Sequence, residues 1–103
     1  MIYADDILTQ AAETYRTKRL EYGDSYTAAG EVIATIYGVD RDEAVRGWLV
    51  TLIVTKLTRY AYNIDKGHRD SLRDMIVYTA MLEAYDTNHN LTGAKNEPTK
   101  RTP

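Results

Sequence analysis

Apolar residues recur every three or four positions through most of this 103-residue chain, and the glycines Gly23, Gly38 and Gly67 separate the stretches that follow this rule. An α-helix has 3.6 residues per turn, so this spacing gathers apolar side chains on one helical face. No stretch alternates apolar and polar residues for long enough to indicate a convincing β-strand. The pattern therefore predicts an all-α protein, a four-helix bundle.

Local signals place the four helices at about residues 4–22, 25–37, 41–63 and 69–86. Asp40, followed three residues later by Glu43, forms a capping-box pattern at the start of the third helix. Gly23 and Gly38 are natural helix stops, and Gly67 can take a left-handed backbone conformation in the turn before the fourth helix. Because that turn is short, we expect the third and fourth helices to be antiparallel neighbours.

The composition fits one small domain. Apolar residues make up 44% of the chain, which is enough for a hydrophobic core. We place this helical domain at residues 1–87. The segment 88–103 is polar and contains one large apolar residue, so we expect a flexible tail there.

Charge, cysteine content and hydropathy exclude several partners and sites. The net charge of −2 and the absence of cysteine argue against a duplex nucleic acid partner, a disulfide or a zinc–thiolate site. No apolar run reaches the roughly 18 residues that span a bilayer, so we expect no membrane partner. The N-terminus, MIYADDILTQ, has no basic segment, so it does not resemble a signal peptide. We therefore expect a cytoplasmic protein.

Charged residues fall on the apolar faces of the third and fourth helices. At about 100° per residue, Lys56 falls among the apolar residues of the third helix, and Arg59 lies at the edge of this group. In the fourth helix, Asp70 and Asp74 lie on the line that Val77 and Met81 continue. Antiparallel packing should therefore bring Lys56, Arg59, Asp70 and Asp74 together near one end of the helix pair.

Two interpretations of this charged cluster are open. It is either an internal set of ion pairs that fixes the helix register, or the lining of a pocket. In the second case Lys56 and Arg59 would bind a phosphate, and the aspartates would orient them or hold a divalent metal. His68 lies at the same end, close to the start of the fourth helix, where exposed N–H groups favour anions.

Aromatic residues extend the pocket interpretation. The chain has nine tyrosines and no phenylalanine, and a tyrosine ring can stack on a base while its hydroxyl donates a hydrogen bond. The tyrosines within plausible reach of the cluster are Tyr22, Tyr26, Tyr60, Tyr62 and Tyr78. Arg19 shares the helical face of Tyr22. We assign the neighbouring Lys18 to the solvated last turn of the first helix.

The order R-x-x-YGDS … KLTR … HRDSLRDMIVY resembles a family of small all-α proteins, common in phages and bacteria, that is related to the MazG-like nucleoside triphosphate pyrophosphohydrolases. The resemblance covers about Ile7 to Tyr85. The positions that match the family pattern are Arg19, Tyr22, Gly23, Asp24, Lys56, Arg59, His68, Asp70, Asp74 and Tyr78. The resemblance implies a MazG-like fold, a nucleotide ligand and assembly into a dimer or tetramer.

The metal-binding part of the family pattern is incomplete. MazG-type enzymes hold magnesium with Glu-x-x-Glu on one helix and a further acidic pair on another, whereas the second helix here supplies only Glu31. An enzyme of this type would have to bind Mg²⁺ with Glu31, Asp70 and Asp74. Magnesium needs several oxygen ligands, and aspartates that are already paired with lysine and arginine are poorly suited to supply them.

Three functions follow, in order of preference. The first is a phage-type nucleotide-binding protein that sequesters a nucleotide or nucleotide-derived signal in the host cytoplasm, for example one used by host defence. The second is a magnesium-dependent (d)NTP pyrophosphohydrolase, so the question of enzymatic activity stays open. The third is an oligomeric helical interaction module whose charged cluster is internal.

Overall fold

The computed structural model describes residues 1–22 and 25–91. Its helices are α1 (Ala4–Tyr22), α2 (Ala28–Tyr37), α3 (Arg41–Tyr62) and α4 (Arg69–Asn88), with a 3₁₀ turn at Ser25–Thr27 before α2. The predicted all-α fold of four helices that pack against each other is confirmed. The predicted helix stop at Gly23 and all but the first four residues of the predicted tail lie outside the described residues.

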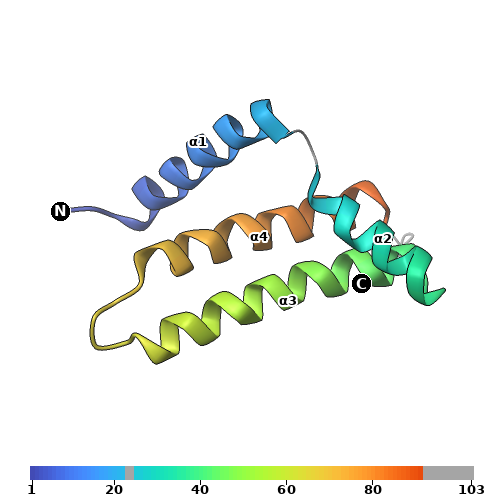
Figure 1. Ribbon diagram of the computed structural model, residues 1–103. Coiled ribbons are helices and arrows are strands. Elements are labelled where there is room, and N and C mark those ends of the chain that lie inside the picture. Colours follow the sequence, from blue (N-terminus) through green and yellow to red (C-terminus); the bar gives the residue numbers. More distant parts are fainter. Residues whose placement is uncertain (23–24, 92–103) are drawn as a thin grey trace, which may run out of the picture.

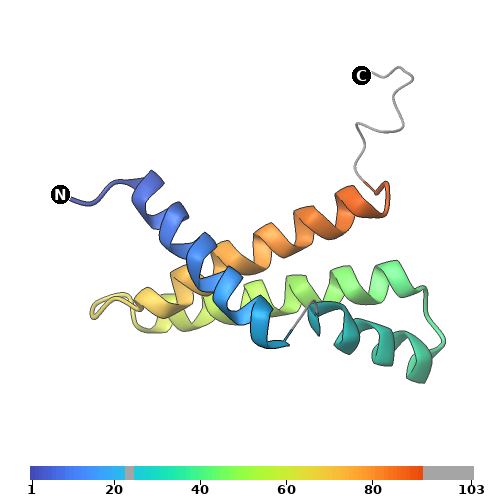
Figure 2. The ribbon, with the colours of Figure 1, turned by 90° about the horizontal axis from the view of Figure 1, so that it is seen from above.

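The α3–α4 pair forms the centre of the fold. These two helices run antiparallel and side by side, as the short turn between them predicts (Figure 1). Helix α1 crosses α4, and α2 packs along the beginning of α3 (Figure 2). Within the residues that the structure describes, no helix is both long and apolar enough to cross a membrane.

The helix boundaries follow local backbone chemistry. An Asp40 carboxylate oxygen accepts a hydrogen bond of 3.0 Å from the backbone N–H of Glu43, which confirms the predicted cap of α3. Gly38 at the end of α2 and Gly67 in the α3–α4 turn have φ values of 65° and 74°, a left-handed conformation that glycine adopts without steric cost. Helix α4 continues two residues beyond its predicted end.

The core lies where α2, α3 and α4 meet. Its fully buried side chains are Val45, Leu49 and Tyr85. Helix α2 approaches α3 very closely at Gly30, because a Cβ atom there would lie 2.4 Å from the Cα of Val45. Among the described residues, the only other buried apolar side chains are Ala11 and Ala44, so the core is small.

Candidate functional site

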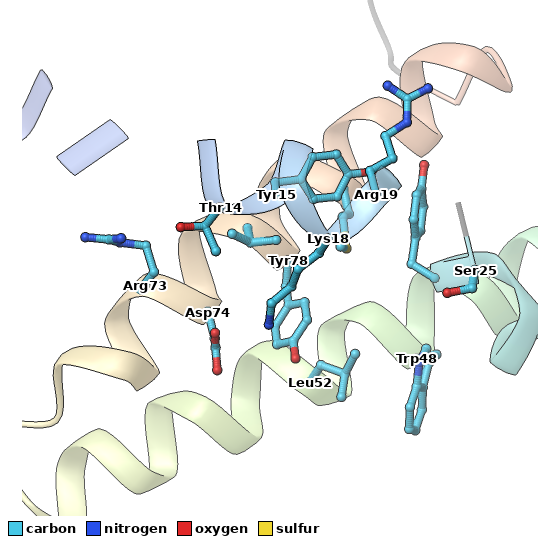
Figure 3. A pocket seen from close by; sticks show the side chains of 13 residues that line it. Thr14, Tyr15, Lys18, Arg19, Ser25, Trp48, Leu52, Arg73, Asp74 and Tyr78 are labelled. Atoms are coloured by element: carbon cyan, nitrogen blue, oxygen red, sulfur yellow. The ribbon is translucent and has the colours of Figure 1, made fainter. Parts of the chain in front are cut away.

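A cavity of about 280 Å³ lies between α1, α3 and α4 (Figure 3). The residues of its lining that carry charges or aromatic rings are Lys18, Arg19, Arg73, Asp74, Tyr15, Tyr26, Trp48 and Tyr78. Apolar side chains such as Leu52, Val77 and Met81 complete the wall. The cavity therefore combines cationic, aromatic and aliphatic surface.

Helical spacing explains why these residues share one cavity. Helix α1 contributes Thr14, Tyr15, Lys18 and Arg19, which are separated by steps of one and three residues. Helix α4 contributes Arg73, Asp74, Val77, Tyr78 and Met81 with the same spacing. Residues three and four apart lie on one side of a helix, so each helix presents one continuous face to the cavity.

Asp74 is the only acidic residue among the described residues that line the cavity, and it already has a cationic partner. Its Oδ2 lies 3.0 Å from the Nζ of Lys56. The Lys56 side chain is 16% exposed and that of Asp74 is 37% exposed. This ion pair confirms the predicted register of α3 against α4, and it neutralises the one acidic group of the lining.

Two of the three cations in the lining have no carboxylate partner among the described residues. Lys18 is exposed and forms no ion pair there, and its side chain extends from α1 towards Asp74 and Tyr78 (Figure 3). Arg73 donates a hydrogen bond of 2.9 Å from Nη2 to Oε1 of Gln10, which is a neutral amide. Counted over the described residues, the lining therefore carries an excess of positive charge.

The predicted site residues separate into two groups. Arg19, Tyr26, Asp74 and Tyr78 line the cavity, and Lys56 contacts it through Asp74. Of the other predicted residues, Arg59, His68 and Asp70 are not part of this lining.

Arg59 and Asp70 are exposed and form no ion pair within the described part of the chain, so the prediction that four charges converge is wrong for these two. Arg59 follows Lys56 by three residues, which turns it about 60° away from the α4 side. His68 precedes α4, where its Nδ1 lies 2.5 Å from the Oγ of the buried Ser71. The side chain of Tyr22 lies outside the described residues.

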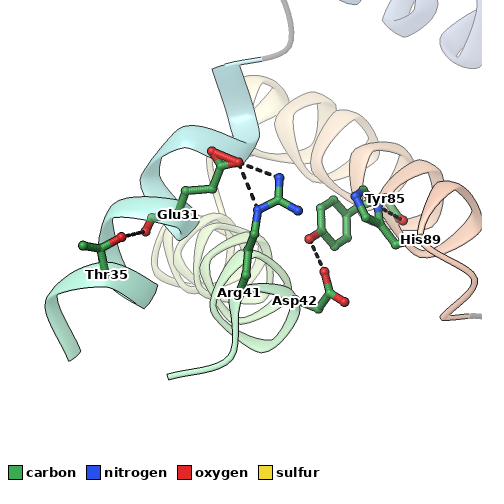
Figure 4. Close-up of polar contacts among 6 residues, drawn as sticks. All are labelled: Glu31, Thr35, Arg41, Asp42, Tyr85 and His89. Atoms are coloured by element: carbon green, nitrogen blue, oxygen red, sulfur yellow. Dashed lines mark hydrogen bonds and ion pairs between the residues drawn. The ribbon is translucent and has the colours of Figure 1, made fainter. Parts of the chain in front are cut away.

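The structure does not bring the predicted magnesium ligands together. Glu31 on α2 forms an ion pair of 2.5 Å with Nη2 of Arg41, the first residue of α3 (Figure 4). Lys56, which pairs with Asp74, lies 15 residues further along α3, or about 22 Å at 1.5 Å per residue. No three acidic or histidine side chains of the described residues are grouped so that they could hold a metal ion. The donor set of the enzyme interpretation therefore does not fit.

A second polar group lies beside the Glu31–Arg41 pair. The hydroxyl of Tyr85 donates a hydrogen bond of 2.5 Å to Oδ1 of Asp42, and its ring stacks on His89 with centroids 3.9 Å apart (Figure 4). Burial first, and then the hydrogen bond to Asp42, raise the pKa of Tyr85 to about 12. Tyr85 is 1% exposed, so this group ties α4 to α3 and offers no open site.

Sequence reasoning missed several residues of the lining. Lys18 was assigned to a solvated helix end, and Arg73, Tyr15 and Trp48 were not assigned to the site. A signal was present for Lys18, which follows Tyr15 by three residues on the face of Arg19. No signal in the sequence showed that α1 crosses α4 at this point.

No family model, curated protein or solved structure matches the chain. The similarity to MazG-like enzymes therefore stays a resemblance in motif. The structure establishes a small all-α protein of four helices.

Proposed function

We propose that the cavity between α1, α3 and α4 binds a nucleotide, with its phosphate on the cationic side chains and its base against the aromatic ones. The observation that carries this proposal is the joint presence of Lys18, Arg19 and Arg73 with four aromatic side chains in one lining. The resemblance to nucleotide-processing proteins suggests the same class of ligand.

The charge of the lining favours an anion. Lys56 balances Asp74, which leaves Lys18 and Arg73 without a carboxylate partner among the described residues. Hydrogen bonds from charged donors to phosphate oxygens are about twice as strong as neutral ones. An incoming phosphate would supply the negative charge that the described residues of the lining do not provide.

The aromatic side chains and the size of the cavity narrow the ligand class. A base can stack on a tyrosine or tryptophan ring, which is worth about 1–3 kcal/mol per base. Pockets for small molecules usually have volumes of roughly 300–1,000 Å³, and this cavity, at about 280 Å³, is at the lower limit. It therefore suits a single nucleotide rather than a polymer.

Binding without metal-dependent hydrolysis fits the site better than turnover. The residues proposed to bind Mg²⁺ are separated, and Glu31 is engaged by Arg41. Binding alone would sequester the ligand, the role that the resemblance to phage proteins suggests.

The test compares two charge-removing substitutions on α1. Lys18→Gln removes a cation from the cavity, whereas Arg16→Gln removes one from a neighbouring apolar groove between α1 and α4. A lost charge-assisted hydrogen bond costs about 1.5–3 kcal/mol, so we expect Lys18→Gln to weaken nucleotide binding by roughly 10–100-fold. Arg16→Gln should change affinity by less than about threefold. Isothermal titration calorimetry with nucleoside mono- and triphosphates in magnesium-free buffer measures both.

Two results would contradict the proposal. One is the absence of binding to every nucleotide tested by the unmodified protein. The other is an equal loss in both variants, which would indicate general electrostatic attraction rather than a site. Release of pyrophosphate in the presence of Mg²⁺ would show instead that the enzyme interpretation is right.

A further inference from the structure

An apolar stripe runs along the outer side of α3, opposite the core. It consists of Gly47, Val50, Val54, Leu57 and Ala61 and is called the outer stripe below. Val50, Val54 and Leu57 are 46%, 53% and 53% exposed, and Gly47 and Ala61 are exposed as well. At about 100° per residue, these positions lie on the side of α3 that faces away from Val45 and Leu49. Three branched aliphatic side chains in one row with no charge among them are unusual for a solvated helix face.

Gly47 is not explained by the packing of one chain. A Cβ atom at this position would meet no heavy atom within 4 Å. Glycine in the middle of a helix is less stable than alanine by about 1 kcal/mol, and the fold offers no compensating contact at this point. By contrast, Gly30 lies directly against the backbone of α3. A small residue on the outer stripe would, however, let a second helix approach closely.

We propose that the outer stripe is a self-association surface, on which α3 of a second copy of this chain packs antiparallel to form a symmetric dimer. With the two-fold axis near Val54, Val50 of one copy meets Leu57 of the other. The same register places Gly47 opposite the end of the partner's stripe near Ala61. Each position of the stripe therefore meets another apolar position of the same stripe, as the same patch on both copies of a two-fold interface requires.

The charges at the ends of the outer stripe favour the antiparallel orientation. Glu43 is exposed on the same side of α3, one turn before Gly47, and Lys66 is exposed just beyond the end of the helix. Antiparallel pairing brings Glu43 of each copy towards Lys66 of the other. Parallel pairing would bring the two Glu43 side chains together, which is unfavourable.

The size of the surface predicts a weak dimer. Helix α3 has 22 residues and is about 33 Å long and 10 Å wide, so one copy covers about 330 Å² with it. Val39 before the start of α3 and Ile64 beyond its end are exposed as well, so they could add some area at the two ends of the contact. Interfaces below about 1,200 Å² in total belong to the weak class, so we expect a monomer–dimer equilibrium at micromolar concentrations.

The first experiment compares Val54→Lys with Thr55→Lys by sedimentation velocity from about 5 to 200 µM, with circular dichroism as the check on folding. Both residues are exposed neighbours on α3, but only Val54 lies in the outer stripe. Close to the two-fold axis, the lysine introduced in one copy would lie beside the lysine introduced in the other, and the two positive charges would repel each other. Val54→Lys should therefore raise the dissociation constant at least tenfold, whereas Thr55→Lys should leave it within about threefold.

The second experiment uses the absence of cysteine from the chain. A single Val54→Cys substitution places two thiols near the two-fold axis, where oxidation should link most of the protein into a covalent dimer. Thr55→Cys, about 100° away around the helix, should give little of this product. Three results would overturn the proposal: an unmodified protein that stays monomeric up to 200 µM, equal association of the two lysine variants, or equal cross-linking of the two cysteine variants.

This proposal is independent of the nucleotide site. The outer stripe lies on the side of α3 opposite Trp48 and Leu52, which line the cavity. Lys18→Gln should therefore leave the sedimentation behaviour unchanged, and Val54→Lys should leave nucleotide binding by the monomer unchanged.

Discussion

Asp74 and Lys56 show how one charged pair can fix the helix register and also lie at a cavity. Lys56 is largely buried and needs a partner, because an unpaired buried charge costs several kcal/mol. Asp74 supplies that partner from α4 and also lines the cavity. The two interpretations of the charged cluster are therefore compatible. The pair fixes the register of α3 and α4, and it neutralises an acid that would otherwise repel a phosphate.

Tyr85 makes the stability of the fold sensitive to alkaline pH. Its pKa rises from 10.0 in its ordinary state to about 12, chiefly because the side chain is buried and then because it donates to Asp42. Below pH 10 the phenol is protonated in both the folded and the unfolded chain, and the stabilisation is complete. Between pH 10 and 12 the unfolded chain loses the proton while the folded chain keeps it. The free energy of unfolding therefore falls as the pH rises through this window.

We predict that the unmodified protein loses about 1 kcal/mol more stability between pH 9 and 11 than the Tyr85→Phe variant does. Phenylalanine keeps the ring in the core but cannot titrate, so the difference isolates this one residue from the other eight tyrosines. Urea unfolding followed by circular dichroism at pH 9, 10 and 11 gives both curves. Parallel pH dependence of the two proteins would show that Tyr85 does not titrate differently on folding.

At the scale of the helices, Gly30 sets how closely α2 packs on α3. A methyl group at this position would lie 2.4 Å from the Cα and 2.6 Å from Cγ2 of Val45, and both contacts are too short. The α3 backbone cannot move without disturbing the core around Val45 and Leu49. The absence of a side chain at Gly30 is therefore a condition of the α2–α3 contact.

We predict that Gly30→Ala destabilises the protein by about 2–3 kcal/mol. Overpacking a well-filled core usually costs about 1–3 kcal/mol, and this cost is larger than the gain in helix propensity from alanine. Thr35→Ala is the matched control, because Thr35 lies on the exposed side of the same helix and should change stability by less than about 0.5 kcal/mol. Thermal or urea unfolding measures both. Equal stability of the two variants would mean that the α2 backbone at Gly30 lies further from Val45 than the 2.4 Å contact of a Cβ atom implies.

The helices could be predicted from the sequence because local chemistry determines where they begin and end. Asp40 with Glu43 marks the start of α3, and Gly38 and Gly67 mark the breaks on either side of it. Residues 25–27 were predicted as the first turn of the second helix but form a 3₁₀ turn instead, which spacing alone cannot distinguish from an α-helical turn.

The candidate site was less predictable because it depends on how helices cross. The Lys56–Asp74 pair follows from an antiparallel hairpin with a short turn, so the sequence was sufficient for it. That Lys18 and Arg73 share one cavity depends on the crossing of α1 over α4, which no local signal encodes. An exposed lysine near a helix end looks the same in the sequence whether it faces solvent or a cavity.

At the scale of the whole molecule, the small core limits the stability of a single chain. Few apolar side chains are buried, while Val50, Val54 and Leu57 are exposed on α3 and Val32 and Ile36 on α2. Each fully buried aliphatic side chain contributes about 1.5–3 kcal/mol, so covering the outer stripe would add substantially to a marginal fold. With the proposed dimer, association becomes part of folding stability, and stability should depend on protein concentration.

We predict that the melting temperature rises with protein concentration, by up to about 3–5 °C for each tenfold increase once most of the protein is dimeric. A tenfold increase favours the dimer by about 1.4 kcal/mol, or about 0.7 kcal/mol per chain, and 1 kcal/mol corresponds to about 4–8 °C in a domain of this size. Scans by circular dichroism between about 10 and 300 µM measure the shift, with Val54→Lys as the control whose melting temperature should change clearly less. A melting temperature that stays constant in the unmodified protein would mean that the exposed aliphatic side chains of α3 remain in water and that the single chain carries its full stability alone.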